Sequence, residues 1–123
     1  MDKTTKKQIT EVLKQYKDMQ FLLDQLNRNL QYCTDERREV RILNTIEAIK
    51  RDKIIIDKAL QSLTDKHRNA FELRFVKELN ADDTAEVMGV NRSTVYTYTN
   101  TIIEAVYDEI FSSHIEKVGD VYE

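Results

Sequence analysis

The sequence predicts an all-α protein in which a long N-terminal helical hairpin is followed by a bundle of shorter helices. Proline is absent from the 123 residues and glycine occurs only at Gly89 and Gly119. These are the two residue types that helix interiors tolerate worst. Apolar residues also recur at steps of three and four over most of the chain, which is the spacing of one helix face. Hydrophobic residues make up 41% of the chain and charged residues 33%, which allows a core beneath a well-solvated surface.

The first predicted helix covers about Thr4 to Tyr32 as one continuous element. Its apolar residues follow alternating steps of three and four, which is the a/d seam of a coiled coil held for about three heptads. The seam residues are Ile9, Val12, Tyr16, Met19, Leu23, Leu26 and Leu30. We therefore expect this helix to pack lengthwise against another helix.

A second predicted helix runs from about Glu36 to Ser62, and either Thr34 or Asp35 can cap it through a side-chain oxygen. Its seam has one polar break, at Lys53, and otherwise consists of Ile42, Ile46, Ile49, Ile56, Leu60 and Leu63. A short connection between two such helices is typical of an antiparallel hairpin. Two helices alone cannot cover both seams. The hairpin, residues 1–62, must therefore pair with a second copy or fold back on the C-terminal half, and we expect a homodimer through the N-terminal helices.

The C-terminal half, residues 63–112, predicts three shorter helices, each preceded by a capping residue. They cover about Asp65–Leu79 after Thr64, Ala81–Met88 after Asn80, and Arg92–Ser112 after Asn91. The third helix carries a stripe that should be buried, formed by Val95, Tyr98, Ile102, Val106 and Ile110. We expect residues 113–123 to be a frayed tail.

The junction between the second and third of these helices has the pattern of a helix-turn-helix motif. Such a motif needs a small residue in its first helix, a turn residue tolerant of positive φ, a cap, and an apolar anchor on the second helix. Ala85, Gly89, Asn91 and Val95 supply these in the right order, and Val90 would plug into the core. A glycine corner also occurs in helical bundles that bind no DNA, so an architectural role stays open.

The side chains expected to face outward on the first turns of the third helix suit DNA chemistry. Arginine can fork onto guanine or a phosphate, asparagine can pair with adenine, and hydroxyls bond to bases or phosphates. The candidates are Arg92, Ser93, Thr94, Tyr96, Thr97 and Asn100. Basic support is expected from the helix before the motif, through Arg74 and Lys77, with Lys66 and Arg68 nearby. No acidic residue occurs from Val90 to Ile103.

The charge distribution of the chain argues against nucleic-acid binding by the C-terminal half. Residues 1–63 hold 13 Lys/Arg and 10 Asp/Glu, a net charge of +3, whereas residues 64–123 hold 6 and 12, a net charge of −6. A nucleic-acid-binding half is expected to be basic, because neutralised phosphates supply most of the nonspecific affinity. Two alternatives therefore stay open: an adaptor whose acidic half grips a basic partner such as an RNA polymerase subunit, and a small terminase-like phage protein that oligomerises through the hairpin.

Several short motifs in the C-terminal half follow a known family pattern. They are Leu63-Thr64, Arg68, Leu73-Arg74-Phe75, Thr84-Ala85, Met88-Gly89-Val90-Asn91 and Arg92-Ser93-Thr94-Val95. Through these motifs, residues 63–110 resemble region 4 of sigma factors, a helix-turn-helix domain that in the family binds the promoter −35 element. The family's recognition helix usually carries several Arg, Glu and Gln side chains, of which only Arg92 is present here. Glu104, Asp108 and Glu109 replace the basic tail that often follows.

A two-helix arm followed by such a domain is similar to small phage transcription regulators of Gram-positive hosts, of the late-gene activator and autolysin-regulator type. The resemblance implies a sequence-specific regulator that binds double-stranded DNA, is encoded by a phage or prophage, and acts as an activator. RNA polymerase is a further expected partner, through the acidic surface. A dimer would place two recognition helices about 34 Å, one DNA turn, apart.

Other functional classes lack a signal in the sequence. We see no nucleophile–base set and no phosphate-cradling glycine loop, so we expect no enzyme and no cofactor. His67 and His114 are far apart, and Asp82-Asp83 fit first-turn acids better than metal carboxylates. We therefore expect no metal site. The start lacks a signal peptide, no run approaches about 18 apolar residues, and the single cysteine, Cys33, suits a reducing compartment. A cytoplasmic protein away from membranes is expected.

Overall fold

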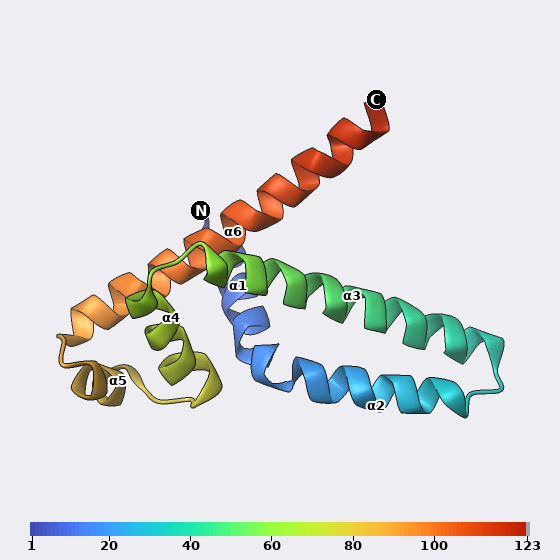
Figure 1. The fold of residues 1–123 in the computed structure, drawn as a ribbon, viewed down its shortest axis with the longest axis horizontal. Helices are drawn as coiled ribbons and strands as arrows, with labels where there is room; N and C mark the ends of the chain where they lie inside the picture. Colours follow the sequence, from blue (N-terminus) through green and yellow to red (C-terminus); the bar gives the residue numbers. More distant parts are fainter. Residues whose placement is uncertain (123) are drawn as a thin grey trace.

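The computed structural model describes the backbone of residues 1–122 and the side chains of residues 1–112. Every regular element in this range is helical, as predicted. The elements are α1 (Lys3–Gln15), η1 (Tyr16–Asp18), α2 (Met19–Gln31), α3 (Glu36–Gln61), α4 (Asp65–Phe71), η2 (Glu72–Val76), α5 (Ala81–Met88) and α6 (Arg92–Tyr122). No described helix combines the length and the apolarity needed to cross a membrane. The α2–α3 hairpin and the far end of α6 project from a common body (Figure 1).

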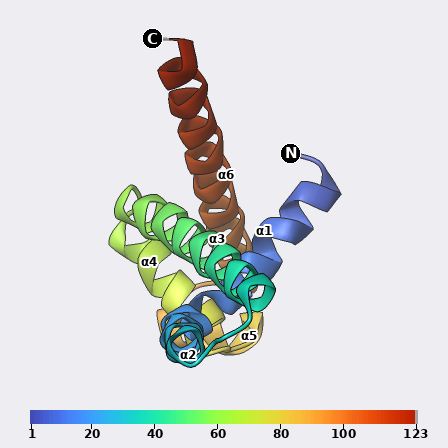
Figure 2. The same ribbon diagram turned by 90° about the vertical axis from the view of Figure 1, so that its right-hand side faces the viewer.

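The predicted single helix over Thr4–Tyr32 is wrong, because the chain bends at η1. One turn of 3-10 helix, closed by the Met19 N–H donating to the Tyr16 carbonyl, separates α1 from α2, and the two helices run in different directions (Figures 1 and 2). The bend lets α1 pack against α6 while α2 packs against α3. The heptad spacing continues through the turn, so periodicity alone could not reveal it.

The largest apolar core is shared by both halves of the chain. It joins α1 and the end of α3 to α4, η2 and the middle of α6; its buried members are Ile9, Leu13, Met19, Ile56, Ala59, Ala70, Phe71, Phe75, Ile102, Ile103 and Val106. The N-terminal segment therefore folds back on the C-terminal half. This was one of the two arrangements that we expected, because the two hairpin helices alone cannot cover both apolar seams.

The predicted helical hairpin is present as α2 and α3, with a small core of its own. Its buried residues are Leu23, Ile42 and Ile46, and Leu26, Leu30 and Cys33 pack beside them. Asp35 begins α3 as one of the two predicted caps, since its Oδ1 accepts a hydrogen bond from the Arg37 N–H at 3.0 Å. The distal part of the hairpin packs only on itself among the described elements.

Lys53, the polar break in the second seam, belongs to a polar cluster at the bend. Its Nζ donates to Asp57 Oδ2 at 3.0 Å, and the Tyr16 hydroxyl donates to Asp57 Oδ1 at 2.5 Å. Burial, followed by the hydrogen bond to Asp57, raises the pKa of Tyr16 to about 12. The Tyr16 ring also meets Phe71 edge-on, with ring centroids 5.3 Å apart. The cluster therefore ties η1 to α3 and α4.

The predicted helix over Asp65–Leu79 ends early, and its capping also differs from the prediction. After α4 the chain widens into a π turn, η2, in which the Lys77 N–H donates to the Glu72 carbonyl at 2.9 Å. Glu78 then takes a positive φ of 58°, and its carboxylate pairs with Lys17 at 2.8 Å. Thr64 stands at the N-cap position, but its hydroxyl pairs with His67 Nδ1 at 2.6 Å instead of a backbone N–H.

The third C-terminal helix is longer than predicted. We expected it to end near Ser112, but α6 continues to Tyr122. Gly119 does not end it, because one interior glycine costs a helix only about 1 kcal/mol relative to alanine. The side chains of the tail that we expected to be frayed, residues 113–123, lie outside the described residues. Ile110, predicted to be buried, is 42% exposed, because α6 leaves the body after Val106.

Candidate nucleic-acid interface

The corner between α5 and α6 has the predicted helix-turn-helix geometry. Asn80 caps α5, with its Oδ1 accepting from the Asp83 N–H at 2.7 Å. Gly89 ends the helix in the left-handed conformation, with φ 68° and ψ 36°, and the Val90 N–H closes the turn onto the Ala85 carbonyl at 3.0 Å. A Cβ at Gly89 would meet no atom within 4 Å. The glycine is therefore needed for its backbone conformation and not for space.

A small apolar core holds the two helices of the motif at this corner. Ala81 and Ala85 on α5 pack against Val95 on α6, which is fully buried, and Val90 fills the turn beside them. The predicted roles of Ala85 as the small contact residue, Val95 as the anchor and Val90 as the plug are confirmed. Asn91 directly precedes α6, and its backbone carbonyl accepts from the Thr94 N–H at 3.0 Å.

Five of the six predicted side chains on α6 are exposed, and the sixth is partly covered. Ser93, Tyr96, Thr97 and Asn100 recur at steps of three and four and so share one face of α6. Arg92 stands at its first turn, and Thr94 is half-buried. The Thr97 hydroxyl donates to the Ser93 carbonyl at 3.1 Å, so its lone pairs stay available to an outside donor. The fold thus brings the predicted α6 residues together.

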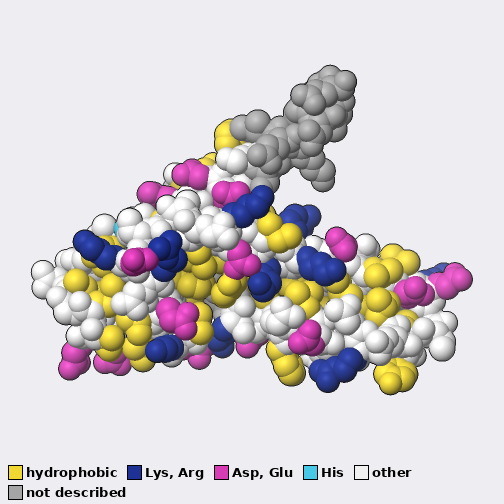
Figure 3. All heavy atoms as spheres, in the orientation of Figure 1, with side chains coloured by type: hydrophobic (Ala, Val, Ile, Leu, Met, Phe, Trp, Pro, Cys, Tyr) yellow, Lys and Arg dark blue, Asp and Glu magenta, His cyan; other side chains and the backbone are white. Residues whose placement is uncertain are grey.

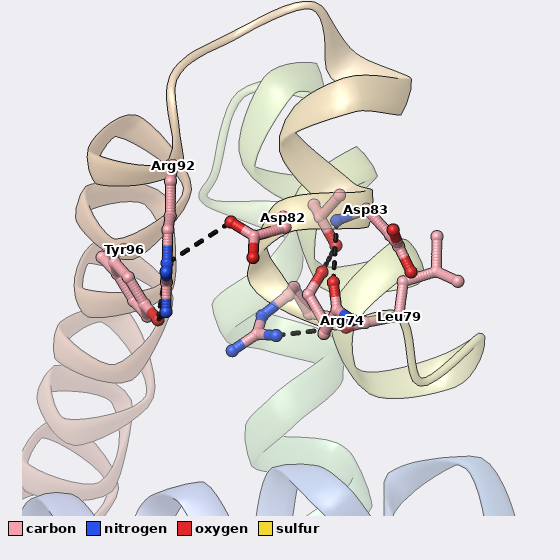
Figure 4. A network of polar contacts seen from close by, with 8 residues as sticks. Arg74, Leu79, Asp82, Asp83, Arg92 and Tyr96 are labelled. Atoms are coloured by element: carbon pink, nitrogen blue, oxygen red, sulfur yellow. Dashed lines mark hydrogen bonds and ion pairs between the residues drawn. The ribbon is translucent and has the colours of Figure 1, made fainter.

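Arg92 is engaged with two neighbouring side chains. Its Nη2 and Nε donate to the Tyr96 hydroxyl at 3.0 and 3.3 Å, and its Nε lies 3.6 Å from Asp82 Oδ1 on α5 (Figure 4). The guanidinium also lies over the Tyr96 ring, 5.5 Å from the centroid. The bond to Tyr96, and then the Asp82 charge, raise the pKa of Arg92 above its ordinary value.

The two basic residues predicted on the preceding helix are placed differently from each other. Arg74 is half-buried, and its Nη1 donates to the Leu79 carbonyl at 3.1 Å, across the loop that leads into α5 (Figure 4). Its Nε is buried without a hydrogen-bond partner among the described residues. Arg74 therefore holds the loop through Nη1. Lys77 follows η2 and is exposed.

Charges of both signs surround the motif. Asp82, Asp83 and Glu86 are exposed on α5, beside the exposed face of α6. On the face of the molecule shown in Figure 3, Lys/Arg and Asp/Glu side chains are interspersed and form no single basic patch. The contact of Asp82 with Arg92 was not foreseen from the sequence. The sequence does hold one signal for this contact: Asp82 lies in the first turn of α5, and Arg92 lies in the first turn of α6.

Among the described residues, no group of three or more His, Cys, Asp or Glu side chains is placed to hold a metal ion. His67 instead stacks edge-on against Tyr98, with ring centroids 5.0 Å apart, while its Nδ1 faces Thr64. What the α5–α6 corner presents to a ligand is the hydrogen-bonding groups and the charge of its exposed polar side chains.

Comparison with known proteins agrees with this geometry. Residues 53–100 match the family described as Sigma-70, region 4. No curated protein and no solved structure gave a match. The matched segment begins inside α3, where Ile56 and Ala59 enter the shared core, and it ends at Asn100 on α6. Region 4 is a helix-turn-helix domain associated with DNA binding and transcription. The C-terminal half of this chain therefore carries a sigma-70 region 4 helix-turn-helix domain.

Proposed function

We propose that this protein is a sequence-specific transcription regulator that places the first turns of α6 in the major groove of double-stranded DNA. The observation that carries the proposal is the exposed face of α6 directly after the Gly89 turn. There a guanidinium, an amide and several hydroxyls lie together on the second helix of a sigma-70 region 4 domain. A major groove admits one α-helix, and its base edges offer the acceptors and donors that these groups complement.

The roles of individual residues follow from their chemistry. Asn100 pairs with adenine, and Arg92 forks onto guanine. The hydroxyls of Ser93, Thr97 and Tyr96 supply bonds to phosphates or base edges. Lys77, which is exposed, and Arg74, whose Nη1 bonds to the Leu79 carbonyl, are the basic residues of the preceding segment that would contact phosphates.

A salt-series titration of the wild-type protein tests this proposal. The probes are fragments from the gene's own genomic neighbourhood, because small phage regulators, which this chain resembles, are expected to act near their own genes. We expect one fragment to be selected over a scrambled fragment of equal composition. The logarithm of the affinity should fall by about 0.9 per neutralised phosphate for each tenfold rise in salt. A folded protein that selects no fragment at low salt would contradict DNA recognition.

The acidic surface supports a second candidate function, an adaptor that grips a basic partner such as an RNA polymerase subunit. Exposed Asp82, Asp83 and Glu86 on α5 and the net charge of −6 over residues 64–123 favour it. Binding to polymerase in the absence of DNA would support the adaptor. Polymerase binding that requires a DNA fragment would instead support an activator.

We further propose that the protein forms a homodimer in which α1 and α3 take part together with α6. The seams expected to pair between copies pack inside one chain. An apolar groove of about 480 Å³ lies between these three helices, and its apolar lining is Ile9, Val12, Ile55, Ile56, Val106 and Ile110. Ile110 and Phe111 project beside the groove, 42% and 57% exposed. In a twofold dimer, the exposed side chains of Ile110 and Phe111 from each copy would enter the groove of the other copy, as a self-complementary interface requires.

Charge favours a second copy as the occupant of this groove. Arg51 and Asp52 both line the groove, and Arg51 forms no ion pair with any residue in 1–112. Asp108 and Glu109 directly precede Ile110 on α6. An antiparallel α6 from a second copy would bring these carboxylates to Arg51 while Ile110 enters the groove.

Replacing Ile110 with aspartate is therefore expected to convert a dimer into a monomer, because a charge in an apolar interface is left without solvent. Sedimentation analysis measures the change. Leu43→Asp is the matched control, since Leu43 is also 42% exposed but lies on the outer face of the hairpin. Loss of the dimer in Leu43→Asp alone would place the interface on the hairpin. A larger ring would favour the terminase-like alternative, and a monomeric wild type would contradict dimerisation.

A further inference from the structure

Arg92 is the only Lys or Arg in the first turns of α6, and an acidic residue already faces it. The sequence holds no other Lys or Arg between Lys77 and Lys117. The Asp82 carboxylate, on the neighbouring helix, lies 3.6 Å from Arg92 Nε (Figure 4). Both side chains are open to solvent, with Arg92 60% and Asp82 69% exposed. A DNA strand that reached Arg92 would therefore meet the carboxylate as well.

The Asp82 carboxylate resembles a DNA phosphate in the way it binds a guanidinium. Both groups are anions whose oxygens accept charge-assisted hydrogen bonds from arginine. Asp82 also lies in the first turn of α5, where the helix dipole favours negative charge. Within the protein, Asp82 therefore occupies the kind of position that a backbone phosphate would take.

We propose that Asp82 acts as a selectivity device that keeps Arg92 from nonspecific phosphates and aims it at a base. The inference rests on the proposed DNA-binding function. On nonspecific DNA, Arg92 would only exchange one anion for another, and Asp82 would be left facing a phosphate. Arg92, the one Lys or Arg in the first turns of α6, therefore releases little counterion on such DNA, and nonspecific affinity stays low.

At a specific site the same arrangement leaves Arg92 able to contact a base. A guanidinium carries five N–H donors. The contacts with Tyr96 and Asp82 engage the Nε–H and one Nη2–H, so the other Nη2–H and the Nη1–H beside it can fork onto guanine O6 and N7. Guanine acceptors are neutral, so Asp82 need not be displaced. The hydroxyl and the ring of Tyr96 hold the Arg92 guanidinium in its orientation.

The test compares Asp82→Asn with Asp83→Asn on the selected fragment and on a scrambled one. The two variants remove the same charge from adjacent first-turn positions of α5. Asp83 is exposed and forms no ion pair with any residue in 1–112, so it controls for net charge and for the helix dipole. Circular dichroism melting checks that both variants fold, and titrations at several salt concentrations give affinities and salt slopes.

We expect Asp82→Asn to raise affinity for the scrambled fragment by up to about eightfold at 0.1 M salt and to steepen the salt slope by about 0.9, the contribution of one more neutralised phosphate. Affinity for the selected fragment should rise less, so selectivity falls. Asp83→Asn should change both fragments alike and keep the selectivity.

Equal effects of the two variants would overturn the inference, since net charge alone would then explain them. A fall in specific affinity without a nonspecific gain would overturn it too, because Asp82 would then act only by orienting Arg92. A wild type that selects no fragment would instead remove the proposed function itself, and this inference with it.

Discussion

Replacing Leu13 with alanine is expected to destabilise the whole protein by about 2–5 kcal/mol, the usual cost of removing a buried leucine side chain and leaving a cavity. Leu13 is fully buried, in the core that α1 shares with Phe71 of α4 and Ile102 of α6. Urea unfolding followed by circular dichroism measures the change. The variant should unfold in one transition at lower urea, because the two halves of the chain share this core.

Leu43→Ala is the matched control for this prediction, because it removes the same atoms from a side chain that is 42% exposed. We expect it to cost well under half as much. If α1 were a separate arm, Leu13→Ala would leave the melting of the helix-turn-helix domain unchanged, and a domain of residues 63–112 would fold alone. That outcome would contradict the shared core.

The double variant Arg92→Ala/Asn100→Ala is expected to lose most of the discrimination between the selected and scrambled DNA fragments. A good two-bond contact between a side chain and a base is worth about 1–3 kcal/mol of discrimination. Loss of two such contacts should therefore reduce the affinity ratio by about 30-fold or more. Both side chains are exposed, so the fold should survive. Competition titrations at fixed salt measure the ratio.

The control for the double variant is Arg41→Ala/Asn44→Ala, which removes the same two residue types from exposed positions on α3. It changes the net charge equally but lies away from the α5–α6 corner. We expect it to keep the discrimination. If both double variants lost affinity equally on all fragments, only charge would be involved, and the proposed base contacts of Arg92 and Asn100 would be wrong.

The local features of the α5–α6 corner could be predicted because each depends on residues close in sequence. Asn80 caps α5, Gly89 takes a positive φ, and Val95 anchors the second helix, as their spacing indicated. The exposed face with Ser93, Thr97 and Asn100 followed from helical periodicity alone. The sigma-70 region 4 resemblance was confirmed over residues 53–100.

The partners of Arg74 and Arg92 were not predicted from the sequence. The bond of Arg74 to the Leu79 carbonyl spans the loop formed by the π turn of η2 and the positive φ of Glu78. Arg92 was expected to face outward, and it is 60% exposed, but its contact with Asp82 was not expected. The Arg92–Asp82 contact also depends on the angle between α5 and α6, which residue spacing does not encode.

The helical class, the hairpin and the turn at Gly89 follow from the amino-acid sequence, since periodicity, capping and glycine conformation act over a few residues. The tertiary structure decided which surfaces the first predicted helix packs against. The seam from Ile9 to Leu30 could serve a second copy or the chain itself, because an apolar stripe specifies burial and not the surface that buries it. The bend at Tyr16–Asp18 divides the seam, so that Leu13 joins the core with α6 and Leu23 joins the core with α3.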